Sequence, residues 1–370
     1  MATGFVFHEL YLWHNTWNFA QVFPPGLTVQ PGEHAENPET KRRFKNLVEV
    51  SGLMDHLVRL PPRPASEDEL ARCHGRAHIA NIKALSEAGY GDASHLTPLG
   101  KGSYEIACLA AGGAIVAAEA VVTGQVQNAY ALVRPPGHHA SVNTGMGFCL
   151  FGNAAVAIRH VQAVHGVGRV ATVDWDVHHG NGTQAIFYDD PTVLTISLHQ
   201  ENLFPPRSGS IDQRGKGAGE GTNINVPLPP GCGPAAYVDA FERIVVPALE
   251  RFSPELIVVP CGFDASGVDP LGRMMMTSAG YRDLTHRLLA LAGRLCEGRL
   301  LFTHEGGYSA THVPYCGLAV LEALSGVTTG IEDPWLPLML EWGGMELKRQ
   351  ERAAIDRAAA ALAGIPIFTQ

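Results

Sequence analysis

The stretch RVATVDWDVHHGNG, residues 169–182, begins as an apolar strand and ends in two aspartates and two histidines. In an extended segment alternate side chains share a face, so Asp174, Asp176 and His178 project together while the residues between them pack the other way. In open parallel α/β sheets, ligands bind beyond the carboxyl ends of the strands. The stretch therefore predicts a parallel α/β fold with a functional site at one edge of the sheet.

Strand-like and helix-like segments alternate along the rest of the chain. Three more apolar runs end in polar residues: YALVR (130–134) before PPGHHA, LIVVPC (256–261) before GFDASG, and RLLFTH (299–304) before EGGYS. Two further runs read as strands, at 193–199 and 223–228, and helical patterns lie at 103–122, after Gly147, at 235–252 and at 281–295. We therefore expect a central, mostly parallel sheet of about eight strands with helices on both faces.

No internal repeat and no linker divides the chain, so we expect a single domain over residues 1–370. Its core should occupy about 5–330, followed by a helical C-terminal tail at about 345–365. The seven cysteines lack the CxxC spacing of thiolate metal sites, which favours reduced thiols in the core.

Composition and charge exclude several classes of protein. A content of 46% hydrophobic and 17% charged residues is typical of a soluble globular chain. The net charge of −9 offers no basic patch for phosphates, so we expect no nucleic-acid partner. The N-terminus has no signal-peptide pattern and no run approaches about 18–20 apolar residues, so we expect no membrane association and a cytoplasmic location.

An acid and a histidine two residues apart can hold one metal ion, and Asp176 and His178 have that spacing. A third ligand must come from elsewhere, and Asp264, just past another strand, is the obvious candidate. Two carboxylates and one neutral imidazole suit a divalent cation that keeps positions open for water and a substrate oxygen, as catalytic zinc requires. Fe²⁺ and Co²⁺ also fit this set.

The other candidate catalytic residues follow neighbouring strand ends. His138 and His139 are adjacent, so their side chains diverge, and we expect them beside the metal as general base and acid. Asp174 would orient one of these imidazoles and raise its basicity. Tyr308 follows two glycines, which let the chain approach the metal and aim the phenol at a developing oxyanion.

Taken together, RPPGHHA, GFC, DWDVHHGNGTQ, SLHQ, GFDAS and EGGYS resemble the motifs of the histone deacetylase and acetylpolyamine amidohydrolase superfamily. With NPETKRR near the start, the chain is most similar to bacterial class II histone deacetylase-like amidohydrolases. The resemblance implies an arginase-like α/β fold and zinc-dependent hydrolysis of N-acyl amides. The histidine pair would deprotonate a zinc-bound water, the tyrosine would stabilise the oxyanion, and His139 would protonate the leaving nitrogen.

The resemblance also assigns roles to individual residues. It implies that zinc binds to Asp176, His178 and Asp264. It also places Asp174 beside His138 and Asn181 beside His139. Because class I enzymes carry aspartate in place of that asparagine, His139 should be less strongly cationic here. The tunnel residues that it implies are Phe148, Phe204, Gly147, Leu271 and Gly306. The potassium ligands that it implies are Asp174, Ser197, His178 and Leu198 at one site, and Phe187 and Val193 at another.

Several alternatives remain open at this point. A binuclear arginase site needs an aspartate where this chain has Gly180, so one metal is favoured. A catalytically silent acetyl-lysine binder would have lost a ligand, the histidine pair or the tyrosine, and all are present. The substrate is either an acyl-lysine, an acetylpolyamine, or a small non-peptide or xenobiotic amide. A homo-oligomer is possible.

Residues at the rim of the tunnel bear on this choice of substrate. In polyamine-selective relatives a glutamate occupies the place of Leu271, and Arg273 lies close by. We therefore predict that neutral acyl amides are preferred over acetylpolyamines. Asp92 is either a rim carboxylate or part of a surface turn, and the loop with Tyr11, Trp13 and Trp17 either shapes the tunnel mouth or contacts another subunit.

Overall fold

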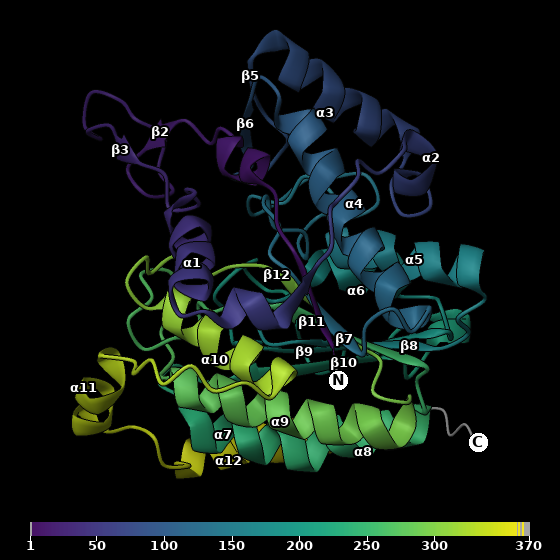
Figure 1. The fold of residues 1–370 in the computed structure, drawn as a ribbon, viewed down its shortest axis with the longest axis vertical. Coiled ribbons are helices and arrows are strands. Elements are labelled where there is room, and N and C mark those ends of the chain that lie inside the picture. Colours follow the sequence, from purple (N-terminus) through teal and green to yellow (C-terminus); the bar gives the residue numbers. More distant parts are fainter. Residues whose placement is uncertain (1, 361, 363–364, 366–370) are drawn as a thin grey trace.

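The computed structural model describes residues 2–360, 362 and 365, and its centre is a parallel sheet (Figure 1). The sheet has eight strands in the order β10–β9–β8–β11–β12–β7–β1–β4. In chain order they are β1 (Thr3–Val6), β4 (Leu57–Arg59), β7 (Asn128–Ala131), β8 (Val170–Asp174), β9 (Val193–Gln200), β10 (Asn223–Leu228), β11 (Leu256–Cys261) and β12 (Leu300–His304). Each pair of neighbouring strands is parallel, which confirms the predicted α/β sheet.

Apolar side chains alternate between two core layers, one on each face of the sheet. In β7, Tyr130 belongs to one layer, and Ala129 and Ala131 to the other. The helices that cover the alanine side are α4 (Ser103–Val122) and α5 (Asn153–His165), and those on the tyrosine side include α9 (Ser278–Leu295) and α10 (Val313–Ser325) (Figure 1). Burial on both faces explains why the strands read as continuous apolar runs.

Shorter elements complete the domain. The remaining α-helices are α1 (Glu39–Val50), α2 (Glu67–Leu70), α3 (Arg76–Ala88), α6 (Asn181–Phe187), α7 (Pro234–Ala240), α8 (Val246–Phe252), α11 (Trp335–Trp342) and α12 (Arg349–Ala359). Two small antiparallel pairs are β2 (Asn18–Phe19) with β3 (Gly32–Glu33), and β5 (Tyr90–Asp92) with β6 (Pro98–Gly100). The predicted helical tail at about 345–365 contains α12, and its residues 361, 363 and 364 lie outside the described part of the chain. All seven cysteines are free and buried.

Helix α4 is long and apolar enough to cross a membrane by length and composition. The expectation that no run approaches this length was therefore wrong for α4. Inside the protein, however, 78% of its most apolar window is buried. Packing in the core thus accounts for the apolar length of this helix.

A buried ion cluster ties the N-terminal segment to the end of β7. The carboxylate of Glu36 accepts hydrogen bonds from Nε of Arg134 at 2.8 Å and from Nζ of Lys41 at 3.1 Å. The exposed fractions of these three side chains are 0%, 0% and 1%. Burial opposes ionisation, but the two cations outweigh it and hold the pKa of Glu36 well below its usual range. Glu36 is therefore ionised at neutral pH.

Replacing Glu36 should unfold the protein far more readily than replacing an exposed glutamate. Glu36→Gln leaves two buried cations without a counterion, which should lower the free energy of unfolding by about 3–5 kcal/mol. Glu39→Gln is the matched control, because Glu39 pairs with Arg42 and Arg43 on the partly exposed surface of α1 and should cost about 1 kcal/mol or less. Urea denaturation of both variants measures the difference, and equal losses would contradict the prediction.

Candidate active site

The four strands with polar carboxyl ends are neighbours at the centre of the sheet, in the order β8–β11–β12–β7. Because these strands are parallel, their carboxyl ends lie at the same edge. The segments that follow them, at 132–140, 175–180, 262–266 and 305–309, therefore meet over the middle of the sheet. Adjacency in the sheet brings together residues that are far apart in the sequence.

Asp176, His178 and Asp264 form a buried cluster in which the candidate ligand atoms all lie within 4.8 Å of one another. Nδ1 of His178 lies 3.0 Å from Oδ1 of Asp176 and 3.1 Å from Oδ2 of Asp264. Backbone amides position both carboxylates, since Val177 N–H donates to Asp264 and Gly306 N–H donates to Asp176, each at 2.8 Å. Two carboxylates and one imidazole in this arrangement fit a divalent cation.

Gly306 lies against the same cluster, as predicted for a residue near the tunnel floor. A Cβ atom at this position would lie 2.1 Å from Oδ2 of Asp264 and 2.7 Å from Oδ2 of Asp176. Any side chain here would push the two carboxylates out of place. The glycine is therefore required for a close approach of the backbone to the candidate ligands.

Burial and the close approach of the three candidate ligands shift the pKa values of Asp264 and His178. Burial raises the pKa of Asp264 to about 6, and the neighbouring charge of Asp176 adds to this effect. Burial lowers the pKa of His178, but hydrogen bonds to Asp176 and Asp264 outweigh burial and raise it to about 10. Because carboxylates and imidazoles bind metals in their deprotonated forms, metal binding here must release protons.

The two adjacent histidines have different partners. Nδ1 of His138 lies 3.0 Å from Oδ2 of Asp174, and Nδ1 of His139 lies 2.7 Å from Oδ1 of Asn181. Each partner oxygen accepts a hydrogen bond from Nδ1–H, which leaves Nε2 of His139 available to accept a proton, while Nε2 of His138 lies 3.7 Å from Oδ1 of Asp176. The ring centroids are 4.0 Å apart. The structure thus places Asp174 and Asn181 beside these histidines, where the resemblance assigned them.

The partners give the two imidazoles opposite charge preferences. Burial lowers the pKa of His138, but the charges of Asp176 and Asp174 outweigh it and raise the pKa well above its usual value. Burial lowers the pKa of His139 well below its usual value, and the charges of His138 and His178 add to this shift. These surroundings therefore favour the protonated form of His138 and the neutral form of His139.

Glu305 holds the histidine segment against the end of β12, a role that we did not predict from the sequence. Its Oε2 atom accepts hydrogen bonds from the backbone N–H groups of Gly137 at 2.6 Å and His138 at 3.0 Å. Burial raises the pKa of this carboxyl to about 7. The sequence signal was the glutamate directly after the strand, but backbone partners cannot be identified from sequence.

Tyr308 lies across the site from the histidine pair, and Asp269 fixes its backbone. Oδ2 of Asp269 accepts hydrogen bonds from the N–H groups of Tyr308 at 2.7 Å and Ser309 at 3.3 Å, and Oδ1 accepts one from Leu271 at 2.9 Å. Burial raises the pKa of the Tyr308 hydroxyl well above its usual value, and the charge of Asp264 adds to this. The phenol is therefore a proton donor at neutral pH. Asp269 was not predicted as a site residue.

A narrow cavity of about 150 Å³ leads to these residues. Its lining residues are Val22, Leu96, His139, Gly147, Phe148, His178, Leu203, Phe204, Leu271 and Tyr308. Among the described residues that line it, none is an aspartate, glutamate, lysine or arginine. The structure thus brings four of the five predicted tunnel residues into the wall, with Gly306 beneath them, and adds Val22, Leu96 and Leu203.

Close packing around the histidines shapes this tunnel. Phe204 packs edge-on against His139, with ring centroids 5.0 Å apart, and Phe148 packs edge-on against Tyr308 at 5.8 Å. Gly147 has a φ of +51°, and a Cβ atom there would lie 2.4 Å from the His139 ring and 2.8 Å from the Phe204 ring. Phe148 itself has a φ of +70°, a strained value that tertiary contacts must maintain.

The candidate rim charges do not line the tunnel. Asp92 accepts hydrogen bonds from the N–H groups of Ser94 and Thr97, at 2.9 and 3.0 Å, so it belongs to the surface-turn alternative. Arg273 is exposed, and its guanidinium donates to the carbonyl oxygens of Pro270 and Gly272 in its own loop. Neither side chain is among the described residues of the tunnel wall.

The predicted potassium ligands lie near the ends of β8 and β9. Asp174 and Ser197 are register partners on these strands, and Leu198 follows on β9. Phe187 ends α6 and Val193 begins β9. Strand pairing thus brings Asp174 and Ser197 of the first set together.

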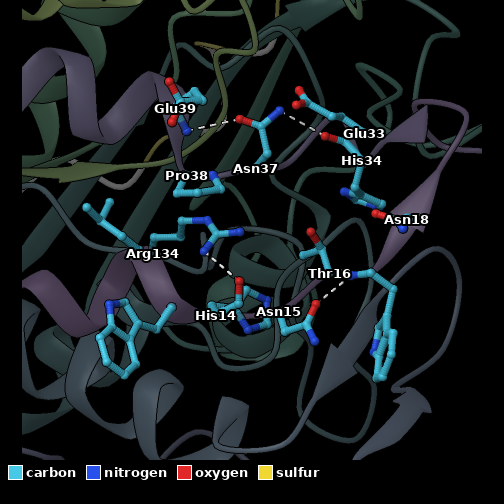
Figure 2. Close-up of a pocket in the computed structure, with 13 residues that line it drawn as sticks. His14, Asn15, Thr16, Asn18, Glu33, His34, Asn37, Pro38, Glu39 and Arg134 are labelled. Atoms are coloured by element: carbon cyan, nitrogen blue, oxygen red, sulfur yellow. Dashed lines mark hydrogen bonds between the residues drawn. The ribbon is translucent and has the colours of Figure 1, made fainter.

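A larger hollow of about 730 Å³ lies beside the N-terminal loop (Figure 2), and its described lining residues do not include Asp176, His178 or Asp264. Trp13 and Trp17 line it together with Arg134, whose Nη1 donates to the backbone oxygen of His14 at 2.8 Å. Tyr11 is buried and donates to the carbonyl oxygen of Leu109 at 3.1 Å. The two tryptophans therefore shape this hollow and are absent from the described tunnel wall.

The protein has a candidate metal cluster at the carboxyl edge of a parallel sheet, and the names of its relatives place it among the hydrolases that act on amide bonds. The chain belongs to the histone deacetylase family, because residues 34–324 match the family model of the histone deacetylase domain. It is 53% identical to a histone deacetylase-like amidohydrolase of Pseudomonas aeruginosa, over 90% of this chain and 88% of that protein. A probable deacetylase of Archaeoglobus fulgidus is 36% identical over 92% of each chain. Among solved structures, the HDA15 HD domain matches with a TM-score of 0.81 and 35% identity, over 98% of both chains.

Proposed function

We propose that this protein is a zinc-dependent amidohydrolase that removes acyl groups from neutral N-acyl amides such as acyl-lysine. The observation that carries the proposal is the buried Asp–His–Asp cluster at the floor of a narrow apolar tunnel. Zinc bound to Asp176, His178 and Asp264 would supply Lewis acidity that polarises the amide carbonyl and lowers the pKa of water. Fe²⁺ suits the same ligands.

The other residues of the site would carry out the proton transfers and charge stabilisation. His139 is neutral with a free Nε2, so it would accept a proton from the attacking water and return it to the leaving nitrogen. His138, held by Asp174, would keep a positive charge beside the reacting centre. The hydroxyl of Tyr308 would donate a hydrogen bond to the developing oxyanion.

Potassium near Asp174 and Ser197 would have a structural role, because it would stabilise the loop that carries the candidate zinc ligands. The register pairing of these two residues supports the first site. The second site, around Phe187 and Val193, rests on the family resemblance. A cytoplasmic location and a homo-oligomeric state stay predictions from the sequence.

The tunnel wall favours an uncharged substrate chain. Desolvating an ammonium group in this cavity is costly, since no described wall residue carries a carboxylate that would pair with it. Leu271 occupies the rim position at which an acidic residue would attract the distal ammonium of a polyamine. The guanidinium of Arg273 is bound to its own loop, so it adds little repulsion. The preference for neutral amides over acetylpolyamines should therefore come from the lack of a carboxylate among the described residues of the tunnel wall.

Neutral acetyl-lysine and trifluoroacetyl-lysine amides should have higher kcat/KM values than acetylputrescine or acetylspermidine on one zinc-loaded preparation. Leu271→Glu should raise the relative kcat/KM for acetylputrescine severalfold, since a partly exposed ion pair contributes up to about 1 kcal/mol. Leu271→Gln is the control, because it has the same length without the charge. A tenfold preference of the unmodified enzyme for the acetylpolyamine, about 1.4 kcal/mol in transition-state binding, would contradict the proposal.

A further inference from the structure

A second group of metal-binding side chains lies where α4 packs on α5. Glu119 comes from α4, and His160 and His165 come from α5. Their ligand atoms all lie within 4.8 Å of one another. Nε2 of His160 is 2.9 Å from Oε1 of Glu119, and Nε2 of His165 is 3.4 Å from the same oxygen. Since α5 ends just before β8 begins, this group lies toward the sheet edge opposite the active site.

The other ring nitrogen of His160 has a fixed carboxylate partner. Its Nδ1 lies 3.1 Å from Oε1 of Glu69, and Arg63 binds Glu69 through two hydrogen bonds of 2.7 and 2.8 Å. These bonds lower the pKa of Glu69 to about 2, so it is ionised. Both ring nitrogens of His160 thus face a carboxylate, and with a metal ion between Nε2 and Glu119 the Nδ1–H group would donate to Glu69. Metal-bound histidines show this arrangement, with a carboxylate on the nitrogen away from the metal.

Arg72 competes for the same nitrogen of His160. Its Nη1 atom lies 3.0 Å from Nδ1, and donation from it would leave the ring proton on Nε2. His160 would then simply donate a hydrogen bond to Glu119, and no metal would be needed. If His160 binds a metal, removing Arg72 should strengthen metal binding. If His160 only donates a hydrogen bond, removing Arg72 should leave metal binding unchanged.

We propose that Glu119, His160 and His165 bind a divalent transition-metal ion and thereby join α4 to α5. Two imidazoles and one carboxylate, with an open position for water, suit zinc best. The side chain of His160 is 5% exposed, whereas those of Glu119 and His165 are 32% and 26% exposed, so one ligand is fixed and the ion enters from solvent. This site is independent of the proposed function, because it shares no residue with the Asp–His–Asp cluster.

Zinc stoichiometry tests the proposal directly. The full chain, freed of metal by a chelator, is titrated with zinc against a chromophoric competitor. The unmodified protein should bind two zinc ions per chain, and His165→Ala should bind one and keep full amidase activity. His286→Ala, which removes an exposed histidine elsewhere on α9, should still bind two. Equal zinc binding by the unmodified protein and His165→Ala would overturn the proposal.

Two variants around His160 separate a metal site from a hydrogen-bonded cluster. Glu69→Gln should weaken the second zinc by about 10-fold to 100-fold, the usual effect of losing such a partner. Arg72→Ala should tighten the second zinc, because it removes the competitor for Nδ1. Unchanged affinity for the second zinc in both variants would show that His160 is not among its ligands and would overturn the proposal.

Thermal melting provides a readout that does not depend on activity. In an Asp264→Ala background, zinc should raise Tm through the second site alone, because a ligand that binds only the native state stabilises it. Adding His165→Ala to that background should abolish the rise. Matching melting curves of the two variants in chelator would show that both fold, and an undiminished zinc-dependent rise in the double variant would overturn the proposal.

Discussion

We expect Asp264→Ala to lose the zinc proposed for the active site and with it the hydrolysis of unactivated acetyl amides. The physical reason is that Asp264 supplies one of the three candidate ligands that the described residues bring together here. One of its oxygens also accepts a hydrogen bond from the backbone N–H of Val177, which positions the loop. The fold should persist, because the substitution also removes one of two crowded, buried carboxylates. Metal analysis, kcat measurement and near-ultraviolet circular dichroism check the three parts of this expectation.

The control for this variant accounts for the surface site on α4 and α5. Zinc content is measured in the His165→Ala variant with and without Asp264→Ala. The expected number of zinc ions per chain is one without Asp264→Ala and none with it. Asp55→Ala, which alters an exposed carboxylate, should keep both zinc and activity. Retention of one tightly bound zinc in the double variant would remove Asp264 from the ligand set.

Tyr308→Phe should lower kcat by roughly 10²–10³, because the ring remains in place while one donor to the oxyanion is lost. Zinc content and KM should change little. The loss should be smaller for a trifluoroacetyl substrate, whose electron-poor carbonyl depends less on a hydrogen bond. Tyr90→Phe is the matched control, since Tyr90 is 63% exposed on the β5–β6 pair. A near-normal kcat on an unactivated acetyl amide would exclude Tyr308 from the mechanism.

The sequence predicted six of the eight strands and missed the last two at one side of the sheet, β1 and β4. Strands β10 and β11 coincide with the predicted ranges, since long β-branched runs bounded by turn residues are a strong signal. β1 and β4, with four and three residues, are too short to show a period and were not predicted. The order of the strands in the sheet could not be predicted from the sequence either, because it depends on contacts between distant segments. Only the structure shows that β8, β11, β12 and β7 are neighbours.

In the site, the candidate metal ligands could be predicted from the sequence. The carboxylates that position the site by accepting hydrogen bonds from backbone N–H groups could not. Asp176, His178 and Asp264 carry a spacing and a residue type that suit a metal. Asp269 and Glu305 bind amide N–H groups, which every segment offers, so nothing in the sequence marks their partners. The tunnel residue Leu96 was missed because its loop folds back through hydrogen bonds of Gly147 and Phe148.

The carboxylate of Asp269 joins two parts of the enzyme that are usually considered separately. One oxygen accepts a hydrogen bond from the backbone N–H of Leu271 at the tunnel mouth, and the other accepts one from the backbone N–H of Tyr308 deeper in the site. A displacement of the backbone at Leu271 would therefore be passed to the backbone of Tyr308 through a single carboxylate. The shape of the tunnel mouth and the position of the phenol are mechanically linked, whereas a change of side chain at Leu271 that leaves its backbone in place should leave the phenol where it is.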